Sequence, residues 1–111
     1  MITQTKPQFL TECLIENLNN EWKVNSIESC RNTYTQLECE IGRKYIKVWS
    51  YLVSGGERLR GRSCWMFVDK NYGECYKPAS HKAPAKGVRY LITQLADNPH
   101  ICDAYGSFLY L

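Results

Sequence analysis

Histidine is scarce in this chain, because His81 and His100 are the only two among 111 residues. Any catalytic pair of a serine or cysteine with a histidine must use one of them. Ser80 precedes His81 directly, but neighbouring side chains of an extended segment point to opposite sides, which makes them a poor nucleophile and base. Glu38 and Glu40 share one face of an alternating segment, and solvated carboxylates are more typical of such a face than a catalytic pair. We therefore predict that the protein is not an enzyme.

Motifs for metal ions and for phosphate-binding turns are also missing. The chain has no Cys-x-x-Cys, and its nearest approach to a ligand cluster is His100-x-Cys102-Asp103, which no second pair of ligands completes. Neither GxxxxGK[ST] nor GxGxxG occurs, which excludes a P-loop and a dinucleotide-binding turn. The sequence predicts no metal ion and no cofactor.

Long apolar runs and export signals are absent too. No run of about 18 apolar residues occurs, and the first residues, MITQTKPQF, contain neither an apolar stretch nor a small-residue cleavage site. We expect a soluble protein that stays in the cytoplasm. Its cysteines lack the signal that accompanies secreted disulfide frameworks, so we expect reduced thiols, most of them small core residues. The six are Cys13, Cys30, Cys39, Cys64, Cys75 and Cys102.

Apolar and aromatic residues are plentiful, at 44% and 13% of the chain. This composition excludes disorder, and the length suits a single domain over residues 1–111. The charge is uneven: residues 1–42 hold three Lys or Arg against six Glu, residues 43–89 hold eleven against three acidic residues, and residues 90–111 hold two Asp only. Eleven basic against three acidic residues give the middle block a net charge of +8. This charge predicts attraction to phosphate or to an acidic protein surface, although Lys and Arg on a sheet can also serve only to keep it soluble.

Apolar residues recur every four positions from Leu10 to Trp22, which predicts an N-terminal helix with one apolar stripe. Asn19 and Asn20 weaken its interior, so we expect the helix to end between residues 20 and 23.

Two strands follow, because the alternation has a period of two from Tyr34 to Ile41 and from Lys44 to Val53. The pattern of the first is that of a strand with one solvent-exposed face. In the second of these, Tyr45, Trp49 and Tyr51 share a side with Lys47. The pattern leaves open whether this side is half of an aromatic core or an exposed stacking platform.

The third strand, over residues 62–70, is apolar almost throughout, which predicts burial on both faces. A turn over residues 69–73 and a short arm over residues 74–77 complete a hairpin. We expect a second helix over residues 85–96 and a C-terminal tail over residues 100–111. The short apolar end of this tail, residues 108–111, is expected to be docked as an edge strand or against the first helix. The sequence therefore predicts an α+β fold with an N-terminal helix, an antiparallel sheet of four to five strands, a second short helix and a docked C-terminal tail.

Two loops carry the candidate ligand-binding residues. Residues 54–62 combine glycines with alternating arginines, which suits close approach to phosphate or carboxylate, although a flexible loop with solvated arginines fits equally. Residues 78–86 form a basic loop, and the helix expected near Pro84 would add backbone amides to an anion site. We expect the two loops to lie close together, because the hairpin returns the chain toward the start of its first arm. The candidate residues are Arg58, Arg60, Arg62, Tyr76, Lys77, Ser80, His81, Lys82, Lys86 and Arg89, with Tyr72 as a further stacking residue.

The stretch FVDKNYGECYKPASHKAPAKGVRYLI, with the Gly-Arg-Ser at residues 61–63 and the terminal YGSFLYL, resembles a group of short bacteriophage proteins of unknown function. Their pattern reads roughly VDK-x-T-G-D, then a K-x-A-S-W-K-A-P-A loop and an arginine, and the resemblance covers about residues 43–111. This chain has Glu74 in place of the Asp and His81 in place of the Trp. The resemblance implies a phage origin and the cytoplasm of an infected bacterium, but no activity.

The leading hypothesis is a small non-enzymatic protein that binds a phosphate-bearing ligand, either nucleic acid or a nucleotide, through the basic hairpin and loops. A second hypothesis is an inhibitor of a host defence protein, with the arginines on an acidic surface. A third is a structural or virion-associated protein whose apolar tail joins copies into a homo-oligomer. None of the three involves a membrane.

Overall fold

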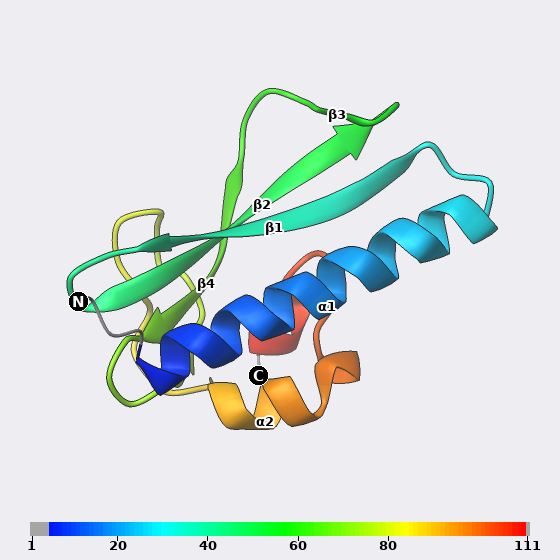
Figure 1. The fold of residues 1–111 in the computed structure, drawn as a ribbon. Helices are drawn as coiled ribbons and strands as arrows, with labels where there is room; N and C mark the ends of the chain where they lie inside the picture. The colour runs from blue at the N-terminus through cyan, green and yellow to red at the C-terminus, as the bar shows by residue number, and fades with distance from the viewer. Residues whose placement is uncertain (1–4, 111) are drawn as a thin grey trace, which may run out of the picture.

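The computed structural model describes residues 5–110 and has the α+β architecture expected (Figure 1). Its sheet is antiparallel with the strand order β1-β2-β4-β5-β6, and β3 pairs with the end of β2. Two of the six strands have only two residues each, too few to show a periodicity in the sequence. The elements in chain order are α1 (Lys6–Glu28), β1 (Thr33–Ile41), β2 (Tyr45–Ser54), β3 (Glu57–Arg58), β4 (Ser63–Asp69), β5 (Glu74–Tyr76), β6 (Tyr90–Leu91), α2 (Ile92–Asp97) and two short 3-10 turns, η1 (Pro99–Ile101) and η2 (Ser107–Leu109).

The core lies between one face of the sheet and the helical segments, which Figure 1 shows together on one side of the strands. Residues that pair across neighbouring strands share a face, and the buried members of this face belong to a single apolar cluster with the helices. The cluster includes Leu14 and Leu18 of α1, Leu37 of β1, Ile46 and Val48 of β2, Met66 and Val68 of β4, Cys75 of β5 and Ile92 and Leu95 of α2.

Helix α1 begins at Lys6 and runs further than the sequence predicts. Thr5 caps its start by accepting a hydrogen bond from the Gln8 amide at 3.2 Å. The predicted end at residues 20–23 is wrong, because the helix continues to Glu28 and the chain turns away at Cys30, whose φ is 56°. No helix among the described residues is long and apolar enough to cross a membrane.

Asn19 explains why α1 does not end at its asparagines. Its side chain donates to the Leu37 carbonyl at 2.9 Å and accepts from the Leu37 amide at 2.7 Å. Leu37 belongs to the edge strand β1, so these two backbone groups face away from β2. Two turns later the Ser26 hydroxyl donates to the Thr33 carbonyl at 3.1 Å. Helix α1 thus covers the edge of the sheet with polar side chains as well as its face with apolar ones.

Strand β4 confirms the predicted burial on both faces. Its register against β2 shifts between Val48 and Trp49, which leaves Trp65 as an extra residue in β4. Trp65 and Met66 both enter the core, whereas Phe67 points to the other side of the sheet. All three are at most 4% exposed.

The turn after β4 also forms as predicted. The Asp69 carboxylate accepts hydrogen bonds from the Asn71 and Tyr72 amides at 2.9 and 2.8 Å. Gly73 then adopts a φ of 74°, a conformation that glycine reaches without strain.

The second helix is much shorter than the prediction of residues 85–96. It starts at Ile92, because the preceding residues are taken by β6, which pairs with β5. Gly87 has a φ of 97° and the Arg89 amide donates to the Cys75 carbonyl at 2.8 Å, so neither residue is helical. The prediction of an anion site at a helix start near Pro84 is therefore wrong, because no helix of the described residues starts there.

The C-terminal tail is docked, as predicted, but as the 3-10 turn η2. Phe108 and Leu109 are buried, and the Phe108 ring lies 5.1 Å from the Trp65 ring and 5.9 Å from the Tyr90 ring between centroids. The Trp65 indole also donates to the Asp103 carbonyl at 3.1 Å. Leu111 lies outside the described residues.

All six cysteines are free thiols. Only Cys75 and Cys102 are buried, so the expectation that most of the six are small core residues is wrong. Burial raises the pKa of the Cys64 thiol to about 11, and it raises the pKa of the Cys75 thiol more than that of Cys64. Burial together with the Asp103 carboxylate raises the pKa of Cys102 to about 12. These three thiols stay protonated at neutral pH and are poor nucleophiles.

Candidate ligand-binding surface

The side of the sheet that faces away from α1 carries aromatic and basic side chains next to one another. Cross-strand pairing places Lys47 opposite Phe67, and Phe67 opposite Tyr76. We call this surface the open face. It consists of Tyr45, Lys47, Trp49 and Tyr51 of β2, Arg58 of β3, Arg62, Phe67 of β4 and Tyr76 of β5.

Cations lie over the rings of the open face. The guanidinium carbon of Arg62 is 3.8 Å from the centre of the Trp49 ring, and that of Arg58 is 4.0 Å from the centre of the Tyr51 ring. The Lys47 ammonium lies 5.7 Å from the Trp49 ring on the same strand. Trp49 is consequently only 6% exposed. The rings form neither a helix-covered core nor a bare stacking platform, because basic side chains cover them.

A stacked guanidinium keeps its hydrogen-bonding edge available. Arg62 uses its face on Trp49, and its recorded hydrogen bond is a long one of 3.4 Å to the Tyr51 hydroxyl. Its N–H groups lie in the guanidinium plane and suit two oxygens of a phosphate or carboxylate. Beneath this arginine, the Trp49 Nε1 is buried and finds no hydrogen-bond partner within the described part of the chain. The centre of the open face is therefore rich in donors.

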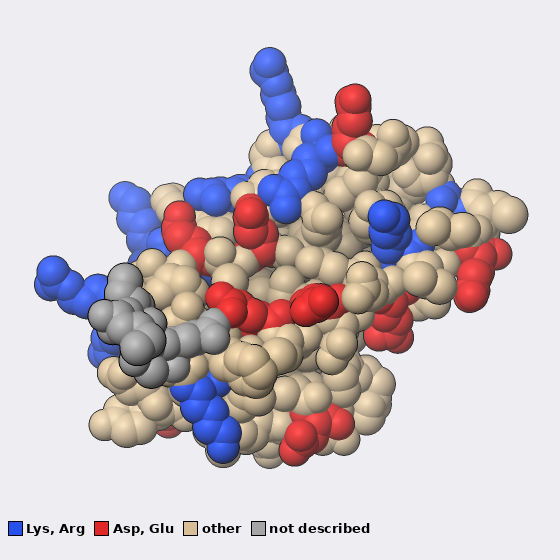
Figure 2. All heavy atoms as spheres, viewed as in Figure 1, with Lys and Arg blue, Asp and Glu red and all other residues tan. Residues whose placement is uncertain are grey.

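Arg58 is held differently. Its guanidinium pairs with the Glu38 carboxylate at 3.1 Å and donates to the Gln36 side chain at 2.7 Å, both on β1. The β1 side of the open face is thus acidic, and Figure 2 shows Asp and Glu gathered over α1 and β1, with Lys and Arg mainly toward the upper and left margins. An anionic ligand is favoured on the side of β2 and β4.

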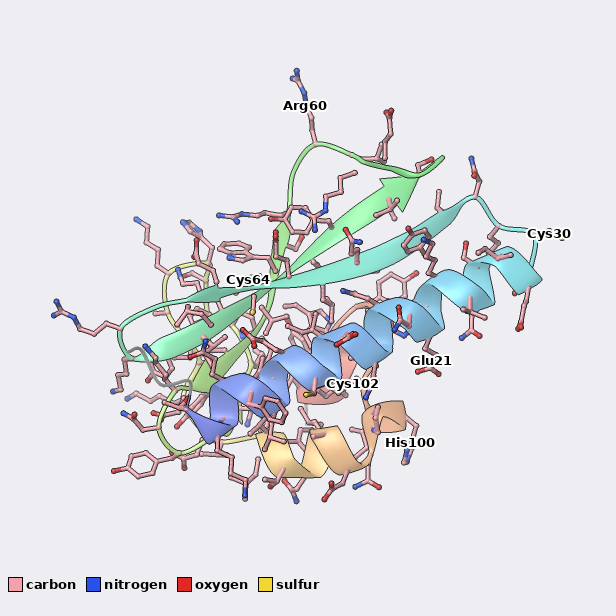
Figure 3. The ribbon with its side chains drawn as sticks, viewed as in Figure 1. Glu21, Cys30, Arg60, Cys64, His100 and Cys102 are labelled. Carbon is pink, nitrogen blue, oxygen red and sulfur yellow. The ribbon has the colours of Figure 1, made fainter. Side chains whose placement is uncertain are left out.

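A cleft of about 530 Å³ opens where β4 begins and β2 continues past it. We call it the arginine cleft. It is lined by Thr35, Ser50, Tyr51 and Leu52, by Leu59, Arg60, Gly61, Arg62, Ser63, Cys64 and Trp65, and by Ala104 and Tyr105 of the C-terminal segment. Figure 3 shows Arg60 at the outer tip of the loop between β3 and β4, pointing away from the sheet.

The loop over residues 78–86 does not join this cleft. Pro78 and Pro84 bridge its two ends, and the Ala85 amide donates to the Lys77 carbonyl at 2.7 Å, so the loop closes on itself. None of its residues lines the cleft that Arg60 and Arg62 border. The loop over residues 78–86 therefore contributes no residue to this cleft, and the predicted meeting of the two loops stays a prediction. Ser80, His81, Lys82 and Lys86 are exposed on the loop.

The remaining predicted residues lie at the margins of the loop. Tyr76 meets Tyr45 edge to face at 6.0 Å, and burial together with Glu74 raises its pKa. The Lys77 ammonium is 4.3 Å from the centre of the Tyr110 ring. Arg89 is partly buried and its Nε finds no hydrogen-bond partner among residues 5–110. The exposed Tyr72 lies in the turn at the other end of β4 from Arg62.

Sequence reasoning left Lys47 and Tyr105 out of the candidate residues. Lys47 was detectable, because it shares the strand face with Trp49 and Tyr51. Tyr105 was not, because only the folded chain brings the C-terminal segment against Trp65 and the loop between β3 and β4. As for metal ions, no group of three His, Cys, Asp or Glu side chains within residues 5–110 is placed to hold one.

Fold and surface together define a small α+β protein in which helices cover one face of the sheet and basic and aromatic side chains line the other. The chain belongs to a family of unknown function, DUF7717, whose model matches residues 3–111. Neither the curated proteins nor the solved structures contain a match to it. The family carries no assigned activity, so the function has to be argued from the surface itself.

Proposed function

We propose that this protein binds a phosphate-bearing ligand, nucleic acid or a nucleotide, without a catalytic step, and that it does so in a phage-infected bacterial cell. The observation that carries the proposal is the stacking of Arg62 on Trp49 beside Lys47. A phosphate oxygen can accept from the in-plane N–H groups of Arg62 while the ring holds the guanidinium in place.

The same arrangement suits a single strand better than a duplex. Bases cannot reach the faces of Trp49 and Phe67, which are 6% and 1% exposed. They can stack on the outer faces of guanidinium groups, as unpaired bases do in many RNA complexes. The open face would then track the backbone with its cations and hold bases by stacking, which requires no particular sequence.

The test is a titration of a fluorescently labelled single strand of about 12 nucleotides at several salt concentrations. We expect affinity to fall steeply between about 50 and 200 mM salt, because neutralised phosphates release counterions. Arg62→Lys keeps the charge and removes the planar fork, so it should weaken binding with little change in the salt slope. Lys23→Gln, on the exposed side of α1, serves as the control. An affinity that does not change with salt would contradict the proposal.

A second candidate is inhibition of a host protein, and a specific surface favours it. Tyr72 and Leu91 are 78% and 44% exposed and border a hollow of about 340 Å³ with Pro7 and Leu10 at the start of α1. Exposed apolar side chains that gather in this way are typical of protein contacts. Nuclease-resistant, stoichiometric recovery of one host protein, lost in Tyr72→Ser, would favour this function over ligand binding.

A third candidate is a structural or virion-associated role in which the tail joins copies. Phe108 and Leu109 are buried in the protein's own core, so such a contact would have to use other residues, of which Tyr110 is 62% exposed.

A further inference from the structure

The arginine cleft differs from the open face in what it offers a ligand. Arg62 belongs to both, but the cleft faces the C-terminal segment and contains Arg60 and Tyr105. Its hydroxyl groups come from Thr35, Ser50, Tyr51, Ser63 and Tyr105, and none of the described residues that line it is Asp or Glu. A cleft with two arginines and no carboxylate is complementary to an anion.

The cleft also has an apolar and aromatic part. Tyr105 is 90% exposed, and Leu52 and Leu59 are 48% and 46% exposed. Tyr105 is nevertheless fixed in position, because its amide donates to the Asp103 carboxylate at 2.9 Å. An exposed ring on a fixed backbone is a surface on which a flat group can stack at small entropic cost.

We propose that the arginine cleft binds one mononucleotide unit, with its phosphate between Arg60 and Arg62 and its base against Tyr105. The volume of about 530 Å³ lies in the range of small-molecule sites. Arg60 points outward in Figure 3, so the bound phosphate draws its side chain inward over the cleft. This inference rests on the proposed function for the class of ligand, but it concerns the cleft beside the open face, which shares Arg62 with that face.

The experiment follows backbone amide shifts by NMR while AMP, adenosine and inorganic phosphate are added separately. We expect AMP to shift the amides of residues 59–63 and 104–106 and to saturate below about 10 mM. Adenosine and phosphate should each bind at least about tenfold more weakly, because each supplies half of the contacts. Equal affinity for adenosine and AMP would show that the arginines do not bind the phosphate of AMP, and would overturn the inference.

Variants separate the two halves of the cleft. Arg60→Gln should weaken AMP binding by about fivefold or more and leave adenosine binding unchanged, whereas Tyr105→Ala should weaken both. Lys23→Gln and Phe9→Ala are the matched controls, since both residues are exposed on α1 and lie outside the cleft. AMP binding that is unchanged in both cleft variants would place the nucleotide elsewhere and would overturn the inference.

A labelled single strand distinguishes the failure of this inference from that of the proposed function. In one outcome, the strand binds in a salt-dependent way while AMP shifts none of the amides of residues 59–63 and 104–106. That result would support strand binding on the open face and would overturn the inference that the cleft binds a nucleotide. If a strand with a 5′-phosphate shifts these amides and the same strand with a 5′-hydroxyl does not, the mononucleotide unit is the end of a strand. If free AMP alone shifts them, the ligand is a free nucleotide.

Discussion

Asn19 lies in the middle of α1, where asparagine costs up to about 0.7 kcal/mol of helix stability relative to alanine. From the sequence alone it reads as a helix terminator, and that reading misplaces the end of α1. Its two hydrogen bonds to Leu37 reverse the balance, because each contributes about 1 kcal/mol to stability. A residue that is unfavourable for its own helix is thus favourable for the edge of the sheet.

Asn19→Ala is therefore expected to lower the free energy of unfolding by about 1 kcal/mol, even though alanine is the better helix former. Asn20→Ala is the matched control, because Asn20 is exposed and neighbours Asn19 in the same helix. The control should be as stable as the natural protein or slightly more so. Urea denaturation measures both variants, and equal stabilities for the two would show that the contact with Leu37 contributes nothing.

Asp103 supports the C-terminal segment and should make stability depend on pH. Burial raises the pKa of its carboxyl, but hydrogen bonds from Ser107, Tyr105 and Phe108 outweigh burial and hold the pKa below its usual value of 3.8. A lowered pKa in the folded state means that stability is present above the unfolded pKa and is lost as pH falls through the folded one.

Asp103→Asn should accordingly be less stable at neutral pH by about 1 to 3 kcal/mol, because charged acceptors make the stronger hydrogen bonds. The difference from the natural protein should shrink as the pH falls below about 5 and through the lowered pKa of the natural carboxyl, where that group becomes protonated. Thermal unfolding across this range measures it, with the exposed Asp97 as Asp97→Asn for comparison. A difference that stays constant with pH would exclude the carboxylate as its cause.

At the scale of elements, periodicity identified α1, β1 and β2, because each has enough residues to repeat a pattern against the core. An unbroken apolar run identified β4, and the turn after it identified β5. It missed β3 and β6, which have two residues each. It also misread residues 85–91, where apolar spacing resembles a helix. Pairing with β5 and the left-handed Gly87 decide that segment, and both depend on a strand distant in the sequence.

The turn between β4 and β5 is the element whose chemistry was most fully predictable, and Gly73 is its strictest position. A Cβ there would lie 2.7 Å from the Ile92 side chain, in addition to the cost of a φ of 74°. Gly61 has a similar φ of 89°, but a Cβ would meet nothing within 4 Å. Gly61→Ala should lower the free energy of unfolding by about 1 kcal/mol. Gly73→Ala should lower it by about 2 kcal/mol more, because this substitution also displaces α2. Comparable losses in the two melting curves would contradict the packing argument.

At the scale of the whole molecule, charge is separated by element. The acidic N-terminal segment forms α1 and β1, and the basic middle block supplies β2 to β5 and their loops (Figure 2). The sequence therefore predicted that there would be a basic region, but not its centre. Arg62 stacks on Trp49 beside the register shift of β2 against β4, and loop 78–86 closes on itself through backbone hydrogen bonds at the bridge between Pro78 and Pro84. Neither arrangement can be read from spacing along the chain.

Two charge reversals of equal size decide which basic region a nucleic acid strand contacts. Lys47→Glu with Arg62→Glu changes the open face, and Lys82→Glu with Lys86→Glu changes the loop over residues 78–86, while the net charge falls by the same amount in both. If the strand lies on the open face, the first pair should weaken binding by at least about tenfold and lower the salt slope by about 1.4, the value for two phosphate contacts in a single strand. The second pair should act only through the overall electrostatic field of the protein and lower the affinity for the strand a few-fold. The reverse order, in variants with equal melting temperatures, would return the site to the loop.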